Sequence, residues 1–362
     1  MLLGLAAGAQ GAPEAWVKYD GNPVLAPATW ATHVNKMAVI KEGPDSYKAW
    51  YTAYKPSGGT LGFNVGYATS SNGKLWTEST LPVLYKSASG EWENPSGANN
   101  KGIYSLTVLK DIDTYRMWYA AGSSPRQIGY AWSSDGLSWT KYNHVNTSSP
   151  YAESDPVLKA ENAWEDEDVY YPSVIKDGSV FKMYYAAKSD PSPDETVRIC
   201  YATSDDGFTW TKPNLDLFSY AGSTNNNIVL VPGAAGSFDS VRTSHPHVIK
   251  DGDVYRMWYG GYQAGAANTW DVGYATSPDG INWTKSLDSP VLVASQAWEM
   301  TTGYRENQAP WVLYDAGLYE MWYYGTSSPA WEMGYAAAIP EPATMGLLAL
   351  GGLGVVIRRR RR

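Results

Sequence analysis

The sequence predicts an all-β fold, a five-bladed β-propeller of four-stranded antiparallel blades, and three observations lead to it. An aromatic-rich strand recurs five times at intervals of 64 to 74 residues. A second strand of the type GYATS follows each copy, and four copies continue with a turn of the type DGxxWT. Long-period repetition of short strands is typical of propeller blades. The aromatic strands are YKAWY (47–51), YRMWY (115–119), FKMYY (181–185), YRMWY (255–259) and YEMWY (319–323).

Each element of the repeat has its own signal. The innermost strand ends in Asp-Gly, most clearly in PSVIKDG (172–178) and PHVIKDG (246–252), and the aromatic strand follows at once. An Asn-Gly or Asp-Gly after the third strand predicts a hairpin, because a type I′ turn needs positive φ at both central residues. The third strands are expected at 66–70, 129–133, 200–204, 273–277 and 334–338.

The fifth unit lacks its outermost strand. After GYAAA (334–338) there is no DGxxWT and no PVL, whereas AWVKYDGNPVL (15–25) contains the Trp and the PVL of that strand. We therefore expect residues 15–25 to pair with residues 332–338 and to close the ring, which leaves no sheet edge between its ends. A degenerate leader left by duplication is the alternative.

Composition excludes several classes of protein. The chain has 362 residues, of which 44% are hydrophobic, enough for a large core. One cysteine excludes an internal disulfide, and four scattered histidines lack zinc-ligand spacing, so we expect no cofactor and leave bound calcium open. The net charge is −8, of which the five terminal arginines supply +5, leaving −13 on residues 1–357. This acidic body argues against nucleic acid as a partner.

The two ends of the chain are expected to be export and sorting signals rather than parts of the folded domain. Residues 1–12 are small and mostly apolar and contain Ala7-Gly8-Ala9, so we interpret them as the remnant of a signal peptide. Residues 343–357 are uncharged and predict a short transmembrane helix, and Arg358–Arg362 should stay on the cytoplasmic side. The propeller is therefore expected over residues 13–338.

The C-terminal residues 339–362 resemble the PEP-CTERM sorting signal. Pro340, Glu341 and Pro342, a hydrophobic span and a basic cluster follow one another in that order. The resemblance implies processing by an exosortase, export across the inner membrane, and a place in the bacterial cell envelope or extracellular matrix.

Polar residues begin the innermost strands, which approach the propeller axis and can converge on one pocket. We compare positions four and two residues before the Pro of PxV, or before its equivalents Met37 and Leu106, because period-two alternation puts both on one face. Unpaired polar groups are costly in a core, so a cavity facing water or ligand is expected. The first position gives His33, Gly102, Asp168, Arg242 and Glu306, and the second gives Asn35, Tyr104, Tyr170, Ser244 and Gln308.

Asp168 and Glu306 are the candidate acid and base, because glycoside hydrolysis uses one ionised and one protonated carboxyl group. Arg242 is expected to lower the pKa of one of them, and His33 to bind substrate or move a proton. The alternatives are a structural ion network of Asp168, Arg242 and Glu306, and ligand binding without hydrolysis. The expected saccharide site also includes Asn35, Tyr170, Ser244, Gln308 and the neighbouring His245 and Arg305.

The sequence contains 17 tryptophans, but thirteen of them recur at fixed places in the repeat and are expected to pack within the blades. Trp270 and Trp331 are not among them. Both precede their third strand by the same spacing, in WDVGY and WEMGY. We expect them beside the long irregular loops, as platforms for sugar rings, with loop packing as the alternative.

With these motifs, residues 15–338 resemble the five-bladed propeller glycosidases of the arabinanase, levansucrase and invertase type, which implies a polysaccharide or oligosaccharide as partner. In that family the acids begin the innermost strands, as Asp-Pro, Asp and Glu-Gly-Pro in the first three blades. This sequence has VNKMAVI (34–40), IYSLTVL (103–109) and VYYPSVI (169–175) there, with Tyr170 at the Glu position. Either Asp168 and Glu306 replace those acids, or the propeller binds saccharide or serves the matrix without hydrolysis.

The SSDGLSW turns also resemble the Asp boxes of sialidases. Their spacing is one residue short, and such boxes are structural turns, so sialidase activity is not expected.

Overall fold

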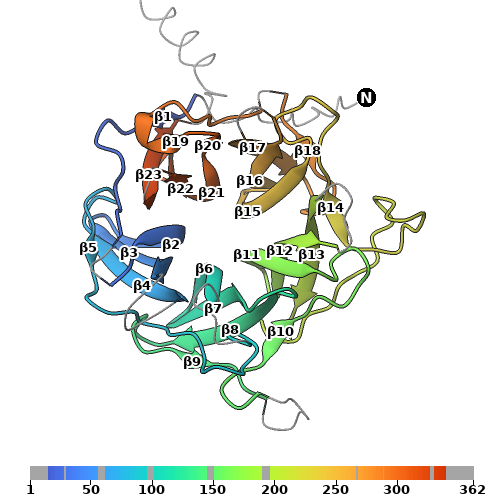
Figure 1. Ribbon diagram of the computed structural model, residues 1–362, viewed down its shortest axis with the longest axis horizontal. Coiled ribbons are helices and arrows are strands. Elements are labelled where there is room, and N and C mark those ends of the chain that lie inside the picture. Colours follow the sequence, from blue (N-terminus) through green and yellow to red (C-terminus); the bar gives the residue numbers. More distant parts are fainter. Residues whose placement is uncertain are drawn as a thin grey trace, which may run out of the picture.

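The computed structural model describes residues 15–27, 30–55, 62–95, 102–144, 151–189, 196–265, 268–287, 289–326 and 330–339. Five antiparallel blades surround a central axis (Figure 1). In every blade the innermost strand pairs with the aromatic strand, and the aromatic strand pairs with the third strand. This arrangement is the predicted five-bladed propeller.

The strands of the first three blades follow one another along the chain. Blade 1 contains β2 (His33–Gly43), β3 (Ser46–Lys55), β4 (Gly62–Ser70) and β5 (Thr77–Glu78). Blade 2 contains β6 (Ile103–Asp111), β7 (Thr114–Ala121) and β8 (Gln127–Ser133), with β9 (Thr140–Lys141) and β10 (Pro156–Leu158) both paired to β8. Blade 3 contains β11 (Asp168–Asp177), β12 (Val180–Lys188), β13 (Val197–Ser204) and β14 (Ile228–Leu230).

The last two blades add short strands near the ring closure. Blade 4 contains β15 (Arg242–Asp251), β16 (Val254–Gln263), β17 (Asn268–Ser277) and β18 (Thr284–Lys285). The 3-10 helix η1 (Ala297–Glu299), β19 (Met300–Thr301) and β20 (Tyr304–Glu306) lead into blade 5. Blade 5 contains β21 (Gln308–Asp315), β22 (Leu318–Thr326), β23 (Trp331–Ala338) and, from the start of the chain, β1 (Val17–Lys18).

Aromatic packing holds neighbouring blades together. The aromatic strand of each blade is buried on both faces because the blades stack face to face, and Trp50, Trp118, Trp258 and Trp322 are 0% exposed. Each of these rings contacts an aromatic ring of the next blade, as Trp50 does with Tyr115 at a centroid distance of 5.2 Å.

The turns between the third and outermost strands differ from the expected type I′ hairpins. In blade 2 the Asp135 carboxylate accepts the N–H groups of Leu137 at 2.7 Å and Ser138 at 2.8 Å, and Ser133 Oγ accepts the Gly136 N–H at 2.8 Å. Of Asp135 and Gly136, the glycine alone has a positive φ, 79°. The side chains of Ser133 and Asp135, rather than two left-handed residues, therefore hold the turn.

A buried carboxylate ties the outermost strand to its blade in blades 2 to 5. In blade 2, Glu93 accepts hydrogen bonds from Lys141 of the outermost strand at 2.6 Å and from the Tyr119 hydroxyl of the aromatic strand at 2.6 Å. In blade 5, Glu299 and the Tyr323 hydroxyl repeat this arrangement, and the lysine is Lys18. The other lysine–carboxylate pairs are Lys212–Glu165 and Lys285–Asp239.

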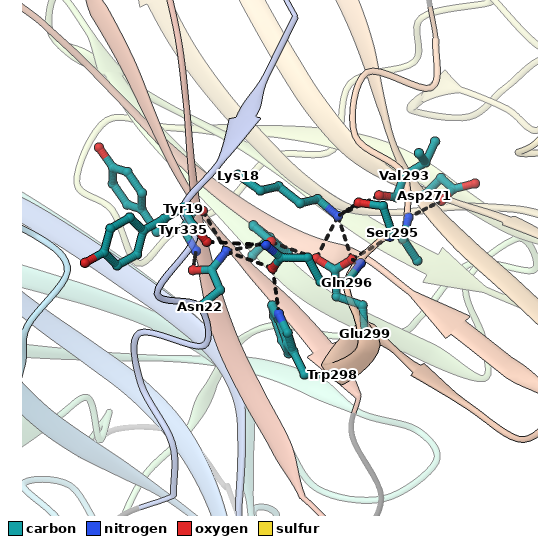
Figure 2. Close-up of polar contacts among 12 residues, drawn as sticks. Lys18, Tyr19, Asn22, Asp271, Val293, Ser295, Gln296, Trp298, Glu299 and Tyr335 are labelled. Carbon is teal, nitrogen blue, oxygen red and sulfur yellow. Dashed lines mark hydrogen bonds and ion pairs between the residues drawn. The ribbon is translucent and has the colours of Figure 1, made fainter.

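The start of the chain completes blade 5, as the sequence predicts. Val17 pairs with Ala337 and Lys18 with Ala336. Figure 2 shows Lys18 Nζ reaching the Glu299 carboxylate at 2.6 Å and the Val293 carbonyl at 2.6 Å. The ring is therefore closed by main-chain pairing and by a buried ion pair.

Among the described residues, no helix is long and apolar enough to cross a membrane. The expected transmembrane helix (343–357), the residues Pro340, Glu341 and Pro342, and the expected signal-peptide remnant (1–12) all lie outside the described residues.

Candidate functional site

A cavity of about 460 Å³ opens at the end of the propeller where the innermost strands begin. Side chains from all five blades line it, so it lies near the propeller axis. Eleven of the residues expected from the sequence are in this lining: Asp168, Glu306, Asn35, Tyr104, Tyr170, Arg242, Ser244, His245, Gln308, Trp270 and Trp331.

A bulge shapes the lining where the innermost strands enter the sheet. In blades 3 to 5 the residue before the Pro of PxV has a positive φ: 51° at Tyr171, 51° at His245 and 53° at Ala309. The pairing register shifts at the same point, between Tyr170 and Ser173 in blade 3. Strict alternation is therefore wrong here, and the consecutive residues Tyr170 and Tyr171 both reach the cavity.

The backbone at each candidate acid is fixed against the blade before it. Asp168 forms a parallel bridge with Arg126, at the start of the third strand of blade 2. Glu306 forms the equivalent pair with Trp270 of blade 4, and the Asn307 N–H donates to the Trp270 carbonyl at 2.9 Å. The backbone of two blades thus positions each carboxyl group.

Asp168 is buried and held by Arg126. The backbone N–H of Arg126 donates to Oδ1 at 2.8 Å, and its guanidinium Nη1 donates to Oδ2 at 2.6 Å. Burial raises the pKa of Asp168, and the Arg126 cation opposes that rise. Arg242 was expected to act on one of the acids, but the cation paired with Asp168 is Arg126, because the parallel bridge brings it alongside.

Glu306 has a different environment. Its side chain is 9% exposed, and burial raises its pKa from 4.5 to about 7, while a hydrogen bond from the Tyr324 hydroxyl acts in the opposite direction. One carboxyl group of the cavity is therefore paired with a guanidinium, and the other with a neutral hydroxyl. Such a difference separates the roles of base and acid in a two-carboxyl site.

The lining contains several ionisable side chains of both kinds. Glu167, next to Asp168, forms an ion pair with Lys188 at 2.9 Å. The Arg242 guanidinium lies 4.9 Å from the centroid of the Tyr262 ring. The lining contains three carboxyl groups and three cations: Glu167, Asp168, Glu306, Arg126, Lys188 and Arg242.

Two buried polar atoms in the lining have no hydrogen-bond partner within the part of the chain that the structure describes, the Ser244 Oγ and the His245 Nδ1. Burial, together with Lys36 and Arg242, lowers the pKa of His245 well below its usual value, so the imidazole is neutral. Buried polar groups are normally hydrogen-bonded, so these two atoms indicate contacts completed by a bound molecule or by water.

The two tryptophans of the lining differ in exposure. Trp270 is 9% exposed and packs edge-on against His245, with 5.2 Å between the ring centroids. Trp331 is half-buried, and His33 packs against it at 4.6 Å in a T-shaped contact. Trp331 therefore keeps more surface for a ligand than Trp270.

Two expected residues lie outside the lining. His33 packs against Trp331 and Tyr54, and Arg305 is exposed on β20. Arg126 was not among the residues expected from the sequence. A signal for it existed, because Arg126 precedes Gly129 by the same three residues that separate Trp270 and Trp331 from their glycines. Five further lining residues were also not expected: Tyr171, Tyr324, Glu167, Lys188 and Ser124.

No group of three or more His, Cys, Asp or Glu residues that could hold a metal ion occurs within the described ranges.

The C-terminal residues 338–362 match the PEP-CTERM protein-sorting motif. This match agrees with the signal expected from the order of Pro340-Glu341-Pro342, an apolar span and the terminal arginines.

Two sequence relatives cover part of the propeller. An uncharacterized protein of Mycobacterium tuberculosis is 29% identical over 240 residues, which are 63% of this chain and 67% of the relative. A 1,2-beta-oligomannan phosphorylase of Thermoanaerobacter is 26% identical over 194 residues, which are 51% of this chain and 59% of the phosphorylase.

Solved structures match nearly the whole chain at low identity. A glycosyl hydrolase from Bacteroides ovatus has a TM-score of 0.67 at 19% identity, covering 93% of this chain and 96% of its own. A beta-1,2-mannobiose phosphorylase from Listeria innocua has a TM-score of 0.62 at 12% identity, covering 92% and 99%. A thermostable family-43 glycoside hydrolase has a TM-score of 0.58 at 14% identity, covering 87% and 91%. This chain therefore has the fold of the five-bladed propeller glycosidases and ends in a PEP-CTERM sorting motif.

Proposed function

We propose that this chain is an exported, surface-associated propeller that binds a polysaccharide or oligosaccharide in the axial cavity and cleaves a glycosidic bond there. Glu306 is the acid and Asp168 is the base. The observation that supports this proposal is the contrast between the two carboxyl groups, one paired with Arg126 and one buried beside a neutral hydroxyl.

The contrast matches the two tasks of glycoside cleavage. A carboxyl group with a pKa of about 7 still carries its proton at mildly acidic pH and can protonate the leaving oxygen. Asp168 receives two hydrogen bonds from Arg126, which favour its ionised form, and can activate the attacking group or stabilise the developing positive charge of the sugar.

Other lining residues supply the contacts that a sugar requires. The Ser244 hydroxyl and the His245 imidazole offer unpaired polar atoms, and Asn35, Tyr170 and Gln308 add amide and hydroxyl groups. Trp331 offers an aromatic surface, with Trp270 as a wall of the cavity. In this proposal His33 positions the Trp331 ring rather than touching the substrate.

Phosphate is an alternative to water as the attacking group. The cations Arg126, Lys188 and Arg242 line the same cavity, and a phosphate dianion would interact favourably with them. Two of the similar proteins are named as phosphorylases, which supports testing this reaction.

A saccharide-binding or matrix propeller without catalysis is the second candidate. Tyr170 stands where the glycosidases that the sequence resembles have a catalytic Glu, and no acid of that family can be transferred by position. In this case the unpaired polar atoms and Trp331 would bind sugar without cleaving it.

The proposed organisation of the chain follows from its two ends. Residues 1–12 are the remnant of a signal peptide, residues 13–338 are the propeller, and residues 339–362 are the sorting and anchor segment. In this proposal the apolar residues 343–357 span the inner membrane until an exosortase processes the segment. The PEP-CTERM match supports this location in the cell envelope or extracellular matrix.

The test is sugar release by the full chain from a panel of plant and bacterial polysaccharides, with and without inorganic phosphate. The wild type is compared with Asp168→Asn, with Glu306→Gln and with Asp20→Asn, an exposed carboxylate outside the lining. We expect the two cavity variants to lose at least about 100-fold in rate, the usual size of an acid or base contribution, and Asp20→Asn to lose nothing.

Two other outcomes are informative. Release of a sugar phosphate only when phosphate is present would identify phosphorolysis. No turnover on any substrate, together with binding on a glycan array that Trp331→Ala abolishes, would favour the non-catalytic propeller.

A further inference from the structure

A recurrent hydrogen bond joins the blades at the end opposite to the cavity. The fourth residue of an aromatic strand donates from its side chain, an indole N–H or a tyrosine hydroxyl, to the carbonyl of the turn glycine in the next blade. Four junctions have this bond: Trp50 to Gly136 at 2.7 Å, Trp118 to Gly207 at 2.6 Å, Tyr184 to Gly280 at 2.8 Å and Trp322 to Gly73 at 2.8 Å.

Three of these glycine carbonyls accept a second hydrogen bond, from the tryptophan three residues further along the chain. The fourth, Gly73, does not, and the equivalent Trp76 indole N–H has no acceptor within the described residues. Gly136, for example, accepts from Trp50 and also from Trp139 at 3.1 Å. The two rings stand edge to face, with 6.0 Å between centroids and 88° between planes. The other two such bonds are Trp210 to Gly207 at 3.1 Å and Trp283 to Gly280 at 3.2 Å.

The fifth junction has the same two rings but no turn glycine. Trp258 and Trp16 stand edge to face at 6.2 Å and 85°, as Trp50 and Trp139 do. Both are buried, at 0% and 9% exposure, and within the described ranges neither indole N–H has an acceptor. Two donors therefore converge where the other blades place a carbonyl oxygen.

We propose that a backbone carbonyl of Pro340-Glu341-Pro342 is this acceptor, so that the sorting motif docks between Trp258 and Trp16 on the folded propeller. The register supports the assignment. Ala338 pairs with Tyr319 as Ser133 pairs with Tyr115, and the accepting glycine of blade 2 comes three residues after Ser133. Three residues after Ala338 is Glu341.

The chemistry of Pro-Glu-Pro suits two donors without an acceptor. Two of its three residues have no N–H, and the residue before a proline prefers an extended backbone, so the segment offers carbonyl groups with few competing donors. A glutamate cannot copy the glycine turn, because a Cβ on Gly136 would lie 2.6 Å from the Trp50 ring. The segment is therefore expected to reach the indoles as extended chain.

A buried arginine stands at the corresponding place in blade 4. In blade 2 the Arg116 Nη1 would lie 3.7 Å from a Cβ placed on Gly207 of the next blade. Arg256 has the same place in the aromatic strand of blade 4, and it is 3% exposed. Arg256 already pairs with Asp251 at 3.0 Å and donates to the Tyr274 hydroxyl at 2.6 Å. If Pro340-Glu341-Pro342 docks here, an exosortase would compete with the propeller for the same segment.

The test uses the full chain, produced in a host without an exosortase, with a single new thiol at Glu341→Cys. The native Cys200 is 0% exposed. The alkylation rate of this thiol is measured in the otherwise wild-type chain, in Trp258→Phe, in Trp16→Phe and in the matched control Trp118→Phe. A synthetic peptide of residues 337–345 with the same substitution gives the unprotected rate.

We expect the thiol to react at least tenfold more slowly in the protein than in the peptide. Trp258→Phe and Trp16→Phe should each restore most of the peptide rate, because phenylalanine keeps a ring but lacks the N–H, and Trp118→Phe should not. A rate equal to that of the peptide in the wild-type chain overturns the proposal, and so does slow reaction that both indole variants leave unchanged. The same rates are measured for a thiol at Pro13→Cys. If the indole variants speed the alkylation of that thiol but not of Glu341→Cys, the acceptor lies in the N-terminal segment instead.

Discussion

Glu306 is the residue whose surroundings predict the most about activity. Its pKa of about 7 reflects burial opposed by one neutral hydrogen bond from Tyr324. If Glu306 donates the proton to the leaving oxygen, activity requires its protonated form. We expect kcat/KM to fall about tenfold per pH unit above pH 7, as a pH–rate profile would show.

A variant of Tyr324 provides the control for this pH–rate profile. Tyr324→Phe removes the hydrogen bond that lowers the pKa of Glu306, so the falling limb should move to higher pH. A limb that stays in place in this variant would mean that another group limits the rate.

Glu306 should also weaken the folded state at alkaline pH. Because its folded pKa lies above the ordinary value of 4.5, the folded protein holds a proton that the unfolded chain releases, and stability falls as pH rises from about 4.5 to about 7. Glu306→Gln should therefore raise the free energy of unfolding at pH 8 by about 3 kcal/mol, because a pKa difference of one between the folded and unfolded states corresponds to about 1.4 kcal/mol.

The measurement is denaturant unfolding of wild type and Glu306→Gln at pH 4 and pH 8. At pH 4 both states of the wild type hold the proton, so the two proteins should have similar stability. An equal difference at both pH values would show that the amide changes packing rather than removing a buried charge.

At the scale of one element, β1 depends on Lys18. Its ammonium is the cation for Glu299, whose side chain is 0% exposed. Lys18→Met would leave that carboxylate buried without its ion pair, and such losses cost about 3 kcal/mol. Lys41→Met, which breaks the exposed pair with Asp315, should cost less than about 1 kcal/mol. Chemical denaturation of both variants compares them, and equal losses would argue against a special role of the closure pair.

At the scale of the whole molecule, the two ends of the chain share one blade. Deleting residues 15–25 exposes the outer edge of β23 and removes the partners of Met333 and Ala336. We expect a clear fall in the thermal unfolding temperature and a tendency to associate through the exposed edge. Moving residues 13–26 to follow Ile339 through an Asp-Gly turn should restore most of the stability. Unchanged unfolding after the deletion would show that the closure contributes nothing.

The sequence alone determined the repeat architecture, because each blade uses the same local chemistry. Aromatic strands, GYATS strands and Gly-containing turns recur along the chain. The strand that is missing from the fifth unit has its counterpart near the N-terminus. It also placed Asp168 at the start of the innermost strand β11 and Glu306 two residues before the innermost strand β21, since register within a repeat is a local property.

The tertiary structure decided the rest, because the site is assembled from different blades. The pairing of Asp168 with Arg126 depends on a parallel bridge between residues 42 positions apart, which no local pattern encodes. The left-handed residues Tyr171 and His245 changed which side chains reach the cavity, and burial raised the pKa of Glu306. Periodicity fixes where a residue lies along its strand, whereas its partners and its exposure to water depend on the packing of all five blades.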